Sequence, residues 1–193
     1  YWLNHQAPFV YSNYNYTSAL ITSGMQNYRG IMNNNPFAYP YPNGGAQAPE
    51  NITFDQKYGW FETRCRVPRG KNIWSAFWML QTTGGIPPEI DVFEIGGDGG
   101  SMKCSDFIDY GLNQIHLDEI AIGYRFYDDF YTYALSWSPN ELKYYLNNEL
   151  IATISNGTNL WVPSNNMYLI LSSAVDLAKS NSENLLQIVK QFQ

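Results

Sequence analysis

The chain of 193 residues contains 45% apolar and 17% aromatic residues, enough for one globular domain of ordinary size. Its formal net charge of −6 argues against a nucleic-acid or anionic-membrane partner, and no apolar run approaches the roughly 20 residues of a membrane span. Charged residues make up only 15%, whereas Gly, Pro and Tyr are frequent, which favours short strands joined by tight turns. We therefore expect one all-β domain over residues 1–193.

Residues 1–57 show few patterns that predict regular structure. Residues 24–52 contain NNNP and YPYPNGGAQAP with few periodic apolar positions, so we expect a long surface loop there, either functional or a passive insertion. Because the chain opens on Tyr1 instead of Met, a trimmed product is expected.

From residue 58 the pattern acquires a period of two, which is typical of strands with one buried face. One predicted face is polar and aromatic, with Tyr58, Trp60, Glu62, Arg64 and Arg66; the other resembles a core, with Gly59, Phe61, Thr63, Cys65 and Val67. After a turn at residues 68–72, residues 74–79 form a second strand of this kind. Cys65 and Cys104 permit one disulfide, although their spacing does not demonstrate it and matches no metal-binding motif.

The segment PPEIDVFEIGGDGG, residues 87–100, sets three carboxylates within an apolar strand. Strand alternation places Glu89 and Asp91 on one face and Glu94 on the other, where burial of a carboxylate is costly. A β-bulge at Val92 and Phe93 would return Glu94 to the first face. A calcium site or a solvated edge strand is the structural alternative, but the apolar neighbours fit an edge poorly and calcium prefers flexible loops. Like charges on one face destabilise each other, so their clustering favours a catalytic role over a structural one.

Further strands are predicted at residues 129–137, 143–153 with a hairpin at Asn147 and Asn148, 167–173 and 185–192. Strands that recur with short turns between them favour a sandwich or a jelly roll. The chemistry that requires paired carboxylates is glycoside hydrolysis, in which a nucleophile and a proton donor flank the scissile bond.

The chain resembles glycoside hydrolase family 16, whose signature is E-x-D-x-x-E, or E-x-D-x-E without the bulge. The longer form stands at residues 89–94, and the resemblance continues through YGWFETRCRVPRGKNIWSAFWML, DFYTYALSWSPNELKYYLNNELI and LLQIVKQFQ. It covers most of residues 58–193. The resemblance implies a concanavalin-like β-jelly-roll sandwich of two curved antiparallel sheets with a cleft on the concave face, so that residues 1–193 form a single catalytic domain.

By matching positions, the resemblance implies that Glu89 is the nucleophile, Asp91 the assisting carboxylate and Glu94 the acid/base. It also places Trp74 and Trp78 in the cleft as platforms for sugar rings, with core packing as the alternative. The resemblance further implies substrate-binding roles for Glu62 and Arg64, with a structural salt bridge as the alternative. It implies the same role for His116, with a purely structural role as the alternative.

The expected function is a retaining, endo-acting β-glycoside hydrolase that cleaves a β-1,3- or mixed-linkage β-1,3(4)-glucan by double displacement. Hydrolysis of algal galactans (agarose, porphyran or carrageenan) and a non-catalytic carbohydrate-binding jelly roll are the alternatives; the three acids argue against the latter. No cofactor and no metal ligand are expected. A structural calcium is the alternative, which is disfavoured because Gln187 stands where the family commonly has an Asp beside such an ion. We expect a secreted or extracellular monomer whose partner is the polysaccharide.

Overall fold

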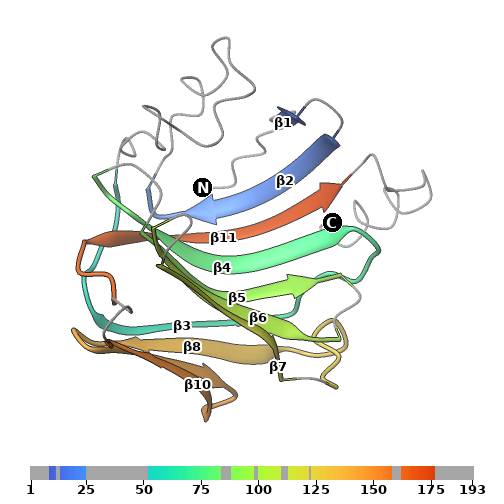
Figure 1. The fold of residues 1–193 in the computed structure, drawn as a ribbon. Helices are drawn as coiled ribbons and strands as arrows, with labels where there is room; N and C mark the ends of the chain where they lie inside the picture. The colour runs from blue at the N-terminus through green and yellow to red at the C-terminus, as the bar shows by residue number, and fades with distance from the viewer. Residues whose placement is uncertain are drawn as a thin grey trace.

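The computed structural model describes residues 9–11, 14–24, 52–83, 88–97, 100–109, 113–121, 123–157 and 162–176. Within these ranges all regular structure is β-strand, and the strands form two curved layers (Figure 1). Every strand pair is antiparallel, so the predicted all-β sandwich of two antiparallel sheets is confirmed. The described residues contain no helix of the length and apolarity needed to cross a membrane.

The larger sheet has seven strands, with β4 and β5 near its middle. In spatial order the strands are β1 (Phe9–Tyr11), β2 (Tyr14–Thr22), β11 (Met167–Asp176), β4 (Ile73–Gln81), β5 (Glu89–Gly96), β6 (Met102–Asp109) and β7 (Asn113–Ile120). The late strand β11 thus lies between the early strands β2 and β4. This crossover joins the two ends of the described chain in one sheet.

The smaller sheet has four strands, which in spatial order are β10 (Glu149–Ser155), β9 (Glu141–Leu146), β8 (Tyr131–Trp137) and β3 (Gly59–Cys65). A tight turn joins β9 to β10, as the sequence predicts. Asn147 and Asn148 both have positive φ, 49° and 67°, as the type I′ hairpin turn requires.

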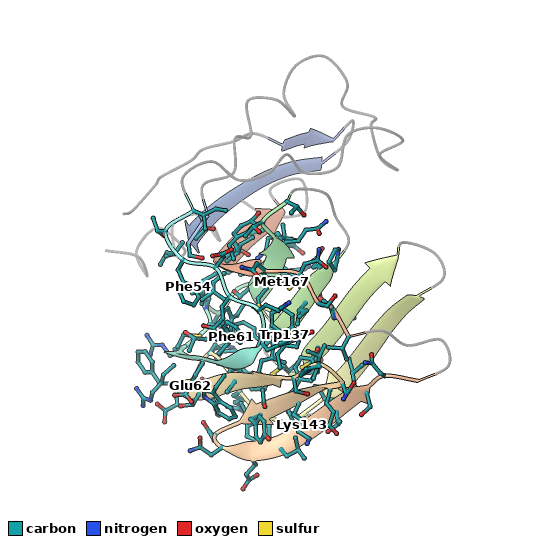
Figure 2. The ribbon with its side chains drawn as sticks, turned by 90° about the vertical axis from the view of Figure 1, so that its left-hand side faces the viewer. Phe54, Phe61, Glu62, Trp137, Lys143 and Met167 are labelled. Carbon is teal, nitrogen blue, oxygen red and sulfur yellow. The ribbon has the colours of Figure 1, made fainter. Side chains whose placement is uncertain are left out.

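The core lies between the sheets and follows from side-chain alternation. On β3, Phe61 is buried whereas Trp60, Glu62 and Arg64 are exposed, so the two predicted faces are confirmed. Phe61 and Trp137 lie between the two layers in Figure 2. The larger sheet contributes Phe77, Met79, Phe93 and Ile95 to the same cluster, and the smaller sheet adds Tyr133, Leu135, Tyr144 and Leu146.

The strands predicted at residues 58–67, 74–79, 129–137, 143–153 and 167–173 correspond to β3, β4, β8, the β9–β10 hairpin and β11. The strand predicted at 185–192 lies outside the described residues, as does nearly all of the loop predicted at 24–52. Cys65 on β3 and Cys104 on β6 are both free thiols, so the disulfide that the sequence left open is not formed.

Candidate active site

A β-bulge on β5 brings the three acids of the signature onto one face. The register pairs each acid with an even-numbered residue of β4: Glu89 with Leu80, Asp91 with Trp78 and Glu94 with Ala76. From Glu89 to Glu94 is five residue steps on β5, but their partners are four steps apart, so β5 holds one extra residue. The bulge expected at Val92 and Phe93 is confirmed, and the register with β6 shows the same shift.

The acids point away from the core, because the residues between and beside them point into it. Ile90, Val92, Phe93 and Ile95 are each at most 2% exposed and belong to the cluster between the sheets. Both residues of the bulge therefore pack inward. We call the opposite side, which carries the acids, the outer face of the larger sheet.

Glu94 is held by a neighbouring indole. The half-buried carboxylate accepts a hydrogen bond of 2.8 Å from Nε1 of Trp74 to its Oε1 atom. Trp74 is 40% exposed, which contradicts the core-packing alternative for this residue. Lys103 lies opposite Glu94 in the register with β6, and its Nζ atom stands 5.9 Å from the centroid of the Trp74 ring. Glu94 thus has a fixed donor on one side and a cation nearby.

Asp91 is far more buried than the other two acids. It is 3% exposed, whereas Glu89 and Glu94 are half-buried. In the register it lies between Trp78 of β4 and Ser105 of β6, near the middle of the sheet. Burying a carboxylate beside two others opposes folding, so a site of this kind is better explained by function than by stability.

Trp78 lies on the outer face, directly opposite Asp91 in the register of β4 with β5. Its Nε1 atom donates a hydrogen bond of 3.1 Å to the Oγ atom of Ser172 on β11. The ring packs against a small cluster of Leu80, Tyr168 and Ile170, which is separate from the main core. Trp78 therefore combines local packing with a position beside the acids.

His116 is aligned with Asp91 across two strand pairs. On β7 it lies opposite Ser105, which in turn lies opposite Asp91. The backbone register thus places His116 two strands from Asp91, at a position of the same face. A role of His116 in binding substrate stays a prediction.

Glu62 and Arg64 require a correction, because the structure does not bring them to the acids. Both lie on β3 in the smaller sheet and alternate with the buried Phe61, so they point outward from the opposite layer; Figure 2 shows Glu62 there. Glu62 accepts a hydrogen bond of 3.0 Å from Nε1 of Trp60. The guanidinium of Arg64 lies 5.0 Å from the ring centroid of Phe130. The expected cleft pair is wrong.

Lys103, which sequence reasoning missed, and Ser172 both contact aromatic residues of the outer face. Ser172 follows from the strand period once the pairing of β11 with β4 is known. Lys103 belongs to MKCSDFID, in which polar residues obscure the alternation of β6. Among the described residues, no three His, Cys, Asp or Glu side chains gather closely enough to hold a metal ion. Gln187, on which the calcium expectation rested, lies outside them.

A sequence model described as glycosyl hydrolases family 16 matches residues 13–188. The endo-1,3-1,4-beta-glycanase ExsH of Rhizobium meliloti is 28% identical over 123 residues, 64% of this chain and 26% of that protein. The glucan endo-1,3-beta-glucosidase of Cryptopygus antarcticus is 32% identical over 114 residues, 54% of this chain and 42% of that protein. The laminarinase catalytic domain of Thermotoga maritima has a TM-score of 0.56 at 29% identity, covering 64% of this chain and 55% of its own.

The matches cover only part of each relative. The chain spans about a quarter of the ExsH protein and less than half of the Cryptopygus protein. The glycanase or glucosidase activity in those names belongs to those proteins.

Proposed function

The chain belongs to glycosyl hydrolase family 16, and from this premise we propose that it is an endo-acting β-glycoside hydrolase. Its proposed substrate is a β-1,3- or mixed-linkage β-1,3(4)-glucan, cleaved with retention of anomeric configuration. The observation that carries the proposal is the bulge of β5, which gathers Glu89, Asp91 and Glu94 on one face. Two carboxyl groups on one face are the minimum that double displacement requires.

In the first step a carboxylate oxygen of Glu89 attacks the anomeric carbon while the glycosidic C–O bond breaks. The electron pair of that bond leaves with the glycosidic oxygen, which takes a proton from Glu94. A glycosyl ester of Glu89 remains, and the other half of the polysaccharide departs. In the second step Glu94, now a carboxylate, removes a proton from water. The resulting oxygen attacks the anomeric carbon and releases Glu89.

Asp91 and the aromatic residues support this chemistry. Asp91 stands between the two glutamates, in the position to orient Glu89 and the sugar bound to it. The exposed ring of Trp74 and the neighbouring Trp78 offer flat apolar surfaces for sugar rings, and His116 is a further candidate for a hydroxyl contact. Glu62 and Arg64 have no part in this proposal, because they lie on the other sheet.

A neutral glucan suits the outer face better than a sulfated galactan does. Sulfate groups require several cations, ideally arginines, near the reacting sugar. The densest basic cluster of the chain includes Arg64 and Arg66, and both guanidinium groups lie over the ring of Phe130, beside the smaller sheet. These cations are therefore directed away from the acids. The glucan relatives named above support the same choice.

We also propose that the enzyme needs no cofactor, because two carboxylates supply both the nucleophile and the proton. We propose further that the protein is a secreted monomer, since polymeric glucans are found outside cells.

A reducing-end assay tests the proposal directly. Purified protein is incubated with laminarin, lichenan, agarose, porphyran and κ-carrageenan, and the products are mapped by size. We expect internal cleavage of laminarin, lichenan or both, and none of the three galactans. Cleavage of a galactan alone would replace the glucan assignment. Glucan binding without any reducing ends would instead identify a non-catalytic carbohydrate-binding protein.

A further inference from the structure

The bulge of β5 faces one residue of β6. Asp91 pairs with Ser105 and Glu94 pairs with Lys103, so Cys104 stands between these pairs, opposite Val92 and Phe93. Two residues facing one is the definition of a β-bulge, and such sites leave the backbone ladder locally interrupted. Whatever holds the bulge in place also decides where Glu94 points.

The Cys104 thiol contacts the bulge directly. Its Sγ atom donates a hydrogen bond of 3.2 Å to the backbone carbonyl oxygen of Val92. Cys104 is 0% exposed and packs in the main core with Ile90, Val92 and Phe93. Because no water reaches this position, loss of the thiol donor would remove a contact that solvent cannot replace.

The donor keeps its proton. Burial, together with the negative charges of Asp91 and Glu94, raises the pKa of the Cys104 thiol well above its usual range. A protonated, buried thiol is chemically inert and serves as a small hydrophobic residue with one weak donor.

We propose that Cys104 is a positioning residue for proton transfer: its thiol holds the Val92 carbonyl and thereby keeps Glu94 directed to the outer face. The inference rests on the proposed function, because it assigns Glu94 the role of proton donor. Cys104 itself touches neither substrate nor reacting atoms. Its effect passes through two backbone residues, from Val92 to Glu94.

The test compares Cys104→Val, which nearly keeps the volume but removes the donor, with Cys104→Ser, which keeps a donor. Cys65→Val is the matched control, since Cys65 is a thiol on β3 of the other sheet. Each protein is assayed on the glucan that the wild type cleaves and on a 2,4-dinitrophenyl glycoside of the disaccharide that it releases. The dinitrophenolate group departs without protonation, so kcat/KM on this substrate does not require Glu94 as an acid.

We expect Cys104→Val to lower kcat/KM on the glucan about five- to tenfold and to change kcat/KM on the dinitrophenyl substrate less than about twofold. Cys104→Ser should recover part of the glucan activity, and Cys65→Val should change neither value selectively. An equal loss on both substrates, or no loss at all, would overturn the inference. If Cys104→Val does not fold, Cys104→Ala serves in the same comparison.

Hydrogen exchange provides a second readout that needs no activity. Amide exchange in the segment 89–97 should be faster in Cys104→Val than in Cys65→Val at equal distance below the melting temperature. Unchanged exchange in this segment would refute the positioning role even if the wild type cleaved no glycoside. Absence of all glycosidase activity would refute the proposed function alone.

Discussion

At the scale of single residues, the hydrogen bond from Trp74 to Glu94 fits the proposed role of Glu94 as both acid and base. An indole N–H only donates, and a protonated carboxyl still keeps one oxygen that only accepts. Nε1 of Trp74 binds Oε1 of Glu94, so Oε1 remains an acceptor in both steps. In the proposed mechanism the other oxygen, Oε2, then gives and receives the proton. Trp74 thus orients Glu94 without having to change its own bonding.

The nucleophile prediction concerns Glu89. Glu89→Gln replaces the attacking carboxylate with a neutral amide, which cannot form a glycosyl ester, so kcat on the glucan should fall by at least about 10³-fold. Glu62→Gln makes the same chemical change on the opposite sheet and should leave kcat within about twofold. Both are measured by reducing-end assay beside melting curves. Full activity in a folded Glu89→Gln protein would contradict the assignment.

The indole prediction concerns Trp74. Trp74→Phe keeps an aromatic ring on the outer face but removes the donor to Glu94. Because a hydrogen bond to a charged group contributes about 1.5–3 kcal/mol, we expect kcat on the glucan to fall about 10- to 100-fold while KM changes little. A rise in KM with kcat unchanged would show instead that Trp74 acts only as a sugar platform.

At the scale of elements, the sequence predicts the bulge better than it predicts the partners of the bulged strand. Alternation on β5 requires an extra residue if Glu94 is to escape burial, and that argument needs no knowledge of neighbouring strands. Lys103 and Ser172 approach the site only through the pairing of distant strands, β6 with β5 and β11 with β4. Such pairings depend on the whole topology and leave no local pattern.

The error over Glu62 and Arg64 has a related cause. The period of two correctly separated the exposed side of β3 from its buried side. Each sheet of a sandwich has an exposed side, however, and the pattern does not indicate to which sheet a strand belongs. The exposed side of β3 belongs to the smaller sheet, whereas the acids lie on the larger one. A face can thus be predicted from local sequence while its position in the molecule cannot.

The bulge yields a prediction about which face of β5 each acid occupies. Deletion of Val92 leaves Glu-Ile-Asp-Phe-Glu, a regular strand in which alternation alone puts all three acids on one face. We expect this variant to lose about 2–4 kcal/mol of stability, because a buried side chain disappears, yet to keep measurable glucanase activity. Insertion of one Ala after Val92 should direct Glu94 inward and abolish activity. If both variants fold but neither is active, placing the three acids on one face is not sufficient for activity.

The same element predicts the stereochemistry of cleavage. The bulge shortens the Cα separation of Glu89 and Glu94 from five strand steps, about 16 Å, to four, about 13 Å, and both side chains extend from one face. The shorter Cα separation favours a distance of about 5 Å between the two carboxyl groups, as in retaining enzymes. That distance leaves no room for a water between nucleophile and sugar. Proton NMR should therefore detect the β-anomer first when a β-glucan is cleaved. Initial formation of the α-anomer would exclude double displacement.

At the scale of the whole molecule, the two sheets enclose groups that ionise only at alkaline pH. Burial raises the pKa of Cys65 to about 11, and burial is also the main cause of a raised pKa at Tyr133 in the centre of the core. Tyr144 spans the layers as well, because its hydroxyl donates a hydrogen bond of 3.2 Å to the backbone carbonyl of Ser105. The packing that supports the outer face thus depends on neutral thiols and phenols between the sheets.

This dependence predicts how stability changes with pH. Thiols and phenols are charged when deprotonated, and their pKa values are higher in the folded protein, so the folded state binds these protons more tightly than the unfolded state does. Their contribution to stability is complete below about pH 9, the unfolded pKa of a Cys, and decreases as pH rises toward 11 and beyond. We expect the melting temperature to fall progressively over this range. Cys65→Val removes one of these groups, so its melting temperature should decline less steeply. The free energy of unfolding that it loses by pH 11 should be smaller than that of the wild type by roughly 2 kcal/mol. All other ionisable groups are present in both proteins, so their contributions cancel in the comparison. Parallel curves for wild type and variant between pH 8 and 11 would show that the thiol of Cys65 is not held neutral by the fold.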